Sequence, residues 1–195
     1  MKKFVPLLLV FILTMAFVTC FADGNNDLKL GMSEEDVISV MGGTGKVGNL
    51  ATSFTGMLTV HFYENQKISI YDDATLNLFF MDGKLVSKLY GFKTDPNANR
   101  YEYLLKALQQ KYGESSENYD IASEMLELYG MGPIIEKYGA EVLLGLLGAK
   151  LATWTAEDGS HITLLYLKND GKGVTSLNYI SSLTDIQIEY DDSDL

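Results

Sequence analysis

Histidine, serine and carboxylate side chains are the groups that could do chemistry in this chain, and their spacing assembles no catalytic set. His61 and His161 are the only histidines among 195 residues, and neither has a cysteine or a second histidine nearby in sequence. A metal site needs several converging ligands. The segment 158–161 reads Asp-Gly-Ser-His, but adjacent residues in a turn and a strand point in different directions and cannot align as nucleophile, base and orienting acid. We therefore expect no catalytic residue, no cofactor and no metal ion.

Three other short patterns resemble ligand sites without meeting their spacing. Asp72 with Asp73, and the segment 191–194, offer carboxylates of the kind that bind calcium, but neither has the glycine and glutamate positions of an EF-hand loop. The segment 42–46, Gly-Gly-Thr-Gly-Lys, has fewer residues between its glycines than a phosphate-binding loop and follows a predicted helix instead of a strand. We interpret the three patterns as a solvated turn, a chain terminus and a helix end.

The twelve tyrosines of the chain are the remaining candidates for a functional role. An antiparallel sheet with helices on one face leaves its other face to water or to a partner. Tyrosine is favoured at protein interfaces because it provides a large contact area at low entropy cost. The strand patterns predict an exposed binding face formed by Tyr63, Tyr71, Tyr90, Tyr166 and Tyr179. The alternative is ordinary cross-strand packing.

A short helix and a set of strands are predicted to position these side chains in the first half of the chain. Ser33 can cap a helix over 33–42, whose first turn carries three carboxylates and which Gly42 ends. Apolar and polar residues then alternate over 54–92, as is typical of strands. The dipeptide Asp82-Gly83 between two such runs is a strong hairpin signal. The prediction for 54–92 is four antiparallel strands.

A second helix and three more strands are predicted in the second half. Asp95 and Pro96 offer a cap and a proline at the first helical position, and an apolar stripe then predicts a helix over 99–112 that ends at Gly113. Alternating segments follow at about 151–156, 161–167 and 173–180.

The hairpins at Asp82 and Asp170 are followed by similar residues, which predicts two repeated helix/β-hairpin units. The expected fold class is α+β: an antiparallel β-sheet with helices packed on one face, and a helical insertion in the second unit. The expected divisions are the first unit at 23–95, the second at 96–190 and an acidic tail at 191–195.

The insertion, about 118–150, carries two apolar helical stripes, and its second stripe includes Leu143, Leu146 and Leu147. In one interpretation the two helices close over the sheet and enlarge the core, because large exposed apolar patches are rare on soluble monomers. In the other, these leucines form a docking surface for a second copy of the chain or for an envelope partner.

The first residues, 1–22, read as a signal peptide: two lysines, an apolar run, and small residues before a cut after Ala22. The apolar run is shorter than the roughly 20 residues of a membrane span. Cys20 leaves a lipid anchor as an alternative, although the residues before it differ from the usual lipoprotein pattern. We expect export to the secreted space, or to the periplasm and cell envelope, and no transmembrane span in the mature chain.

The acidic net charge of the chain limits the classes of molecule that we expect it to bind. The formal net charge is −11, Arg100 is the only arginine, and loss of the two lysines with residues 1–22 leaves −13. Nucleic-acid affinity depends on neutralising phosphates with Lys and Arg. Nucleic acid and anionic lipid are therefore excluded as expected partners, and a basic protein surface is favoured.

The segment 30–37, Leu-Gly-Met-Ser-Glu-Glu-Asp-Val, followed by Gly42 and alternating strands, resembles the opening of the small outer-membrane assembly lipoproteins of the SmpA/OmlA (BamE) type. Two such helix-plus-sheet units in tandem resemble the β-lactamase inhibitory protein, a secreted binder. The resemblance covers 33–92 and, less closely, 99–180. It implies an exported, non-catalytic protein-binding module. The alternatives are an exported hydrolase that uses surface carboxylates and a purely structural envelope protein.

Overall fold

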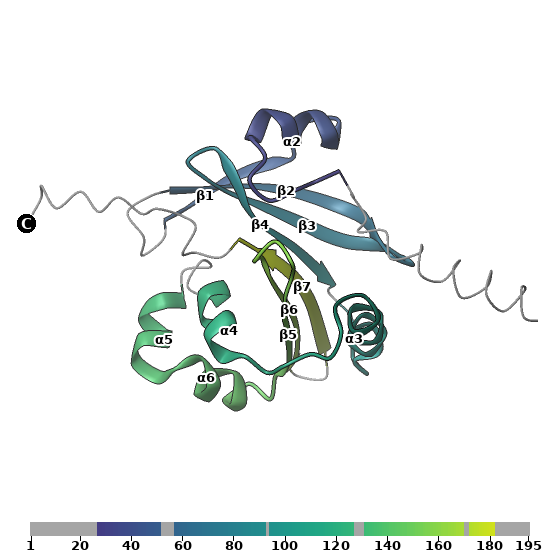
Figure 1. Ribbon diagram of the computed structural model, residues 1–195, viewed down its shortest axis with the longest axis vertical. Coiled ribbons are helices and arrows are strands. Elements are labelled where there is room, and N and C mark those ends of the chain that lie inside the picture. Colours follow the sequence, from purple (N-terminus) through teal and green to yellow (C-terminus); the bar gives the residue numbers. More distant parts are fainter. Residues whose placement is uncertain (1–26, 52–56, 93, 127–130, 170–171, 182–195) are drawn as a thin grey trace, which may run out of the picture.

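The computed structural model describes residues 27–51, 57–92, 94–126, 131–169 and 172–181, which form an α+β fold around one antiparallel sheet. The strand order is β1-β2-β3-β4-β7-β6-β5 (Figure 1). The helices are α2 (Glu34–Met41), α3 (Asn99–Tyr112), α4 (Tyr119–Leu126), α5 (Gly132–Tyr138) and α6 (Ala140–Leu146). The strands are β1 (Lys46–Ala51), β2 (Met57–Ile68), β3 (Tyr71–Met81), β4 (Lys84–Phe92), β5 (Lys150–Thr155), β6 (His161–Asn169) and β7 (Lys172–Ile180). The predicted signal peptide with Cys20, the predicted turn at Asp170 and the acidic tail lie outside the described residues.

Helix α2 begins and ends where the sequence predicts. The Ser33 hydroxyl accepts a hydrogen bond from the backbone amide three residues later, and Gly42 follows the helix in the left-handed conformation with φ of 71°. The residues before the helix pair with the start of β4, where the amide of Gly31 donates to the carbonyl of Leu85. Helix α2 is thereby fixed against the β3–β4 hairpin.

The described part of 54–92 holds three strands where the sequence predicted four. Strand β2 continues through two of the predicted strands, with register shifts between Tyr63 and Ile68. Asn65 has a φ of 55° there, so the alternation breaks without ending the strand. The hairpin prediction is confirmed: Asp82 and Gly83 have φ values of 50° and 71°, as a type I′ turn requires.

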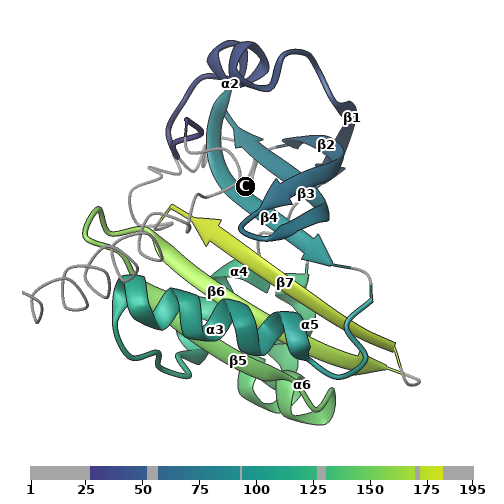
Figure 2. The same cartoon turned by 90° about the vertical axis from the view of Figure 1, so that its right-hand side faces the viewer.

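Two helices cover one face of the sheet, as predicted. Val37 of α2 and Leu104 and Leu108 of α3 are fully buried in one core together with residues of β2 to β7. Figure 2 shows α3 lying along β5, β6 and β7 on this face.

Helices α4, α5 and α6 lie on the opposite face, against β5 and β6 (Figure 1). The chain between α3 and α4 reaches that face past the edge of β5, where Ser116 and Thr153 exchange two backbone hydrogen bonds of 3.1 and 2.8 Å. Met125 of α4 and Leu144 of α6 then pack in a second core with Leu165 of β6. Helices therefore cover both faces of the sheet, which corrects the prediction of one.

The proposed repeat of two units stays a prediction. The β3–β4 and β6–β7 hairpins lie side by side, because β4 pairs antiparallel with β7. Within the described ranges the first half holds four strands and the second half three, and α4 to α6 have no counterpart in the first half.

Candidate binding surface

The tyrosines predicted to form an exposed face lie instead in or against the core, which corrects that prediction. Tyr90, Tyr166 and Tyr179 are only 1%, 5% and 5% exposed, and Tyr63 and Tyr71 are half-buried against the same core. Register explains the burial, since Tyr90 stands between core residues of β3 and β7 on the face that α2 and α3 cover. The rings of Tyr90 and Tyr179 meet edge to face with centroids 6.5 Å apart. Ordinary cross-strand packing, the alternative interpretation, accounts for them.

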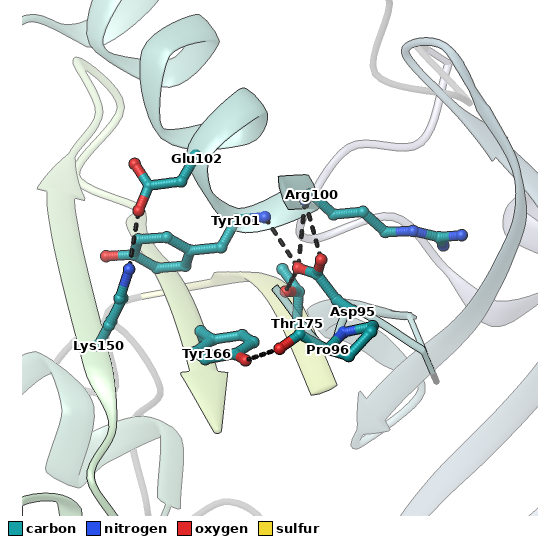
Figure 3. A network of polar contacts seen from close by, with 8 residues as sticks. All are labelled: Asp95, Pro96, Arg100, Tyr101, Glu102, Lys150, Tyr166 and Thr175. Atoms are coloured by element: carbon teal, nitrogen blue, oxygen red, sulfur yellow. Dashed lines mark hydrogen bonds and ion pairs between the residues drawn. The ribbon is translucent and has the colours of Figure 1, made fainter. Parts of the chain in front are cut away.

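A buried polar network fixes the start of α3 (Figure 3). The carboxylate of Asp95, which is 3% exposed, accepts hydrogen bonds at 3.2 Å from the backbone amides of Arg100 and Tyr101. It also accepts a hydrogen bond at 2.5 Å from the hydroxyl of Thr175 on β7. The N-cap position of α3 is held by Ala98, which makes no side-chain cap bond, and not by Asp95 as the sequence predicted. The Asp95 carboxylate lies three residues earlier and still satisfies amides that the first turn of a helix leaves free.

A cleft of about 300 Å³ brings together two carboxylates, those of Glu64 and Asp73. Its other lining residues are Asn65, Thr75 and Thr94. Two hydrogen bonds of 2.8 and 2.7 Å join the Arg100 guanidinium to Asp73 and lower the pKa of that carboxyl. Lys46 contacts Glu64 at 3.2 Å. Both carboxylates therefore belong to ion pairs. Asp73 lies in β3 and not in the solvated turn that the sequence predicted.

The two histidines each contact a carboxylate from a helix. His61 is fully buried, and its Nε2 lies 2.8 Å from Oε1 of Glu34 in the first turn of α2. His161 Nε2 lies 3.7 Å from Oε2 of Glu124 on α4. Each contact joins a strand to the helix packed above it.

In the segment 158–161 the serine and the histidine have different partners. Ser160 donates its hydroxyl hydrogen to Asp158 at 2.6 Å, and this bond lowers the pKa of the Asp158 carboxyl. His161 contacts the hydroxyl of Thr155 at 3.3 Å instead. Within the described ranges, no group of three or more His, Cys, Asp and Glu side chains is placed to hold a metal ion.

Large apolar side chains are exposed on the outer sides of α5 and α6. Ile134 and Tyr138 of α5 are 43% and 53% exposed, and Val142 and Leu146 of α6 are 53% and 80% exposed. Residues four apart share one side of a helix, so each pair forms a continuous strip. We call these four residues, together with Leu147 at 47% exposure, the α5–α6 face.

The structure divides the leucines that the sequence singled out. Leu146 and Leu147 lie at the surface, whereas Leu143 is half-buried and its neighbour Leu144 is only 3% exposed in the second core. The insertion thus both enlarges the core and presents an apolar surface. The second apolar stripe of the sequence analysis also contains Ile134, Tyr138 and Val142, whose four-residue spacing marks one side of each helix.

Charged residues of both signs lie in the segment that carries the α5–α6 face. Residues 131–150 contain two acidic residues, Glu136 and Glu141, and two basic residues, Lys137 and Lys150. Lys150 lies away from the α5–α6 face, because its ammonium contacts Glu102 of α3 at 2.8 Å on the other side of the sheet. None of the helices in the described part of the chain combines the length and apolarity needed to cross a membrane.

Comparisons with protein-family models, with curated proteins and with solved structures find no match for this chain. The resemblance to the BamE-type lipoproteins and to the β-lactamase inhibitory protein therefore stays a prediction.

Proposed function

We propose that this chain is an exported, non-catalytic protein-binding module and that the α5–α6 face is its binding surface. The observation that supports this most directly is the exposure of Leu146, at 80%, among four other large apolar side chains that are each more than 40% exposed. Clustered exposed apolar side chains of this kind mark interaction sites on soluble proteins. This role is also the one that the resemblance to secreted and envelope binding proteins implies.

The packing beneath the face supports the same role. Helices α5 and α6 are held to the sheet by a separate set of buried residues, among them Ile135, Ala140 and Leu144. The exposed side chains are not needed for that contact. Burying them against a partner would remove apolar area from water, at roughly 25 cal/mol per Å².

A photo-crosslinking amino acid at position 146, introduced in the cells that produce the protein, tests the proposal. We expect a covalent adduct from position 146. Ile70, which is 63% exposed between β2 and β3, provides the matched control position and should give none. Absence of an adduct at 146, or equal adducts at both positions, would contradict the proposed surface.

Export is tested separately by the mass of the mature protein. Cleavage after Ala22 gives a chain that begins at Asp23. A diacylglycerol mass on Cys20 would replace the soluble form with a lipid-anchored one. Retention of residues 1–22 inside the cell would contradict export.

A further inference from the structure

We infer that residues 182–190 of this chain dock as an extended strap over a third apolar core of the sheet. The third core consists of side chains that are all 5% exposed or less, namely Leu58, Val60, Phe79, Val86 and Ile180. It is separate from the second core beneath the α5–α6 face, so the inference does not rest on the proposed function.

The third core lies on the sheet face opposite α2 and α3. Leu78 of β3 belongs to the core that α2 and α3 cover, so the adjacent Phe79 points to the other face. Val60 of β2 stands directly opposite Phe79 and shares that face. Helices α4 to α6 lie on this face too, but they pack on the second core over β5 and β6. The described side chains that form or border the third core all come from strands.

The burial of the third core requires a covering segment. An uncovered face of an antiparallel sheet is open to water on its outer side. Leu58 and Val60 are nevertheless 0% exposed, and Phe79 is 3% exposed. These side chains are buried in the single chain, so the segment that covers them belongs to the chain itself and not to a partner.

The chain passes into residues 182–195 at the edge of the third core. Ile180, the last residue of β7, is one of its members. The backbone amide of Ser181 donates a hydrogen bond of 2.9 Å to the carbonyl of Val86, another member. The chain that follows therefore starts beside the side chains that need a cover.

The sequence of the strap suits an apolar face. Residues 182–190 read Ser-Leu-Thr-Asp-Ile-Gln-Ile-Glu-Tyr. In an extended chain Ile186, Ile188 and Tyr190 point to one side, and the polar residues between them point to the other. An extended strap of this length spans about 30 Å. The distance from β7 across β4 and β3 to β2 is about 15 Å, so the strap is long enough to cross the third core.

Photo-crosslinking from position 190 tests where the strap lies. A photoreactive phenylalanine derivative replaces Tyr190, and the adducts of the purified protein are mapped by mass spectrometry. We expect a crosslink within one chain, to β2, β3 or β4. A crosslink to any other element, a crosslink between two chains, or no crosslink would overturn the inference.

Ile188→Asp and Gln187→Asp form a matched pair of full-length variants. Ile188→Asp should lower the thermal unfolding midpoint by about 5 °C, because it places a charge against the third core. Gln187→Asp introduces the same charge on the polar side of the strap and should leave the midpoint unchanged. Equal midpoints in the two variants would contradict the docked strap.

Removal of residues 183–195 should expose the third core, and the truncated chain should bind an apolar fluorescent dye. A synthetic peptide of residues 182–195 should abolish the dye binding, whereas the same peptide with Ile186→Asp and Ile188→Asp should not. A truncated chain that binds no more dye than the full-length protein would overturn the inference. If truncation prevents folding, the full-length variants at 187 and 188 still decide it.

The strap and the proposed function fail separately. The photo-adduct from position 146 should be the same in the wild type and in Ile188→Asp, because the two apolar surfaces have different cores beneath them. Loss of the adduct from position 146 in the wild type would overturn the binding surface and leave the strap standing.

Discussion

Thr175 and Asp95 are 80 residues apart in the chain, and the Thr175 hydroxyl donates a hydrogen bond of 2.5 Å to the Asp95 carboxylate. The same carboxylate accepts the backbone amides of Arg100 and Tyr101. One buried side chain therefore joins the start of α3 to the middle of β7. Loss of this side chain affects the helix and the sheet together.

Asp95→Ala should lower the free energy of unfolding by about 2–4 kcal/mol, because it leaves amides of the first turn of α3 and the buried Thr175 hydroxyl without their acceptor. Urea unfolding measures the change. Thr175→Val should cost about 1 kcal/mol, and Thr175→Ser should restore most of it. An Asp95→Ala variant as stable as the wild type would show that the network does not hold α3.

Gly173→Ala should destabilise the fold by about 1–3 kcal/mol. A Cβ at position 173 would lie 1.9 Å from the carbonyl oxygen of Asp95, so the backbone must move apart. Gly145→Ala is the matched control, since no atom lies within 4 Å of a Cβ built there. We expect Gly145→Ala to keep or raise the thermal unfolding midpoint, because alanine favours the helix.

The raised pKa of Tyr101 leads us to expect a loss of stability at high pH. Burial, with smaller contributions from Glu102 and Glu117, raises the pKa of Tyr101 from 10.0 to about 12. Between these values the unfolded chain releases the phenol proton while the folded chain keeps it, so stability is complete below pH 10 and falls as the pH rises toward 12. Urea midpoints across this range should decline less steeply in Tyr101→Phe. The surface variant Tyr138→Phe should keep the wild-type slope.

The ion pair of Arg100 and Asp73 leads us to expect a loss of stability at low pH. Hydrogen bonds from Arg100 lower the pKa of Asp73 below 3.8, so the stabilisation is present above that value and is lost as the pH falls through the folded pKa. Because Asp73 is half exposed, the ion pair contributes about 1 kcal/mol or less to the free energy of unfolding. Asp73→Asn should therefore lower stability slightly at pH 7 and make no difference in strong acid. A difference that persists in acid strong enough to protonate Asp73 in the folded protein would contradict the ion pair as its cause.

Neighbouring leucines of α6 should respond differently to substitution. Leu144→Ala should cost about 2–5 kcal/mol, because Leu144 is 3% exposed in the second core. Leu146→Ala should change the free energy of unfolding by less than about 0.5 kcal/mol at concentrations where the protein is monomeric. Leu143→Asp, at a half-buried position, should fall between the two. Equal losses at 144 and 146 would show that both helix sides are core.

Local signals predicted those parts of the fold whose geometry depends on a few adjacent residues. The cap at Ser33, the left-handed glycine at position 42 and the Asp82-Gly83 turn all lie where the sequence indicates. Strand β1 was not predicted, because Lys46–Ala51 contains a glycine and an asparagine and has only weak alternation. Its place at the edge of the sheet depends on pairing with β2.

The candidate surface could be predicted only in part, because periodicity identifies an apolar stripe without showing what covers it. Tyr90 and Tyr179 alternate as residues of an exposed face would, yet the face they occupy is the one that α2 and α3 cover. On α6, Leu144 and Leu146 belong to one apolar run, and the position of the sheet beneath the helix decides which is buried. Helix α6 lies on that side of the sheet because the chain passes the edge of β5 at Ser116.

The pairing of β4 with β7 has a consequence for the order in which the chain folds. Strands β1 to β4 each pair with a neighbour in sequence, so this part of the sheet can form early. Strand β4 also pairs with β7, where the Ser87 hydroxyl donates to Asn178, a residue 91 positions further along the chain. Until β7 arrives, the outer edge of β4 presents unpaired backbone groups that another chain can bind. Residues 27–92 alone should therefore aggregate on refolding, and a kinetic competition between aggregation and β7 docking should set the yield of the whole protein.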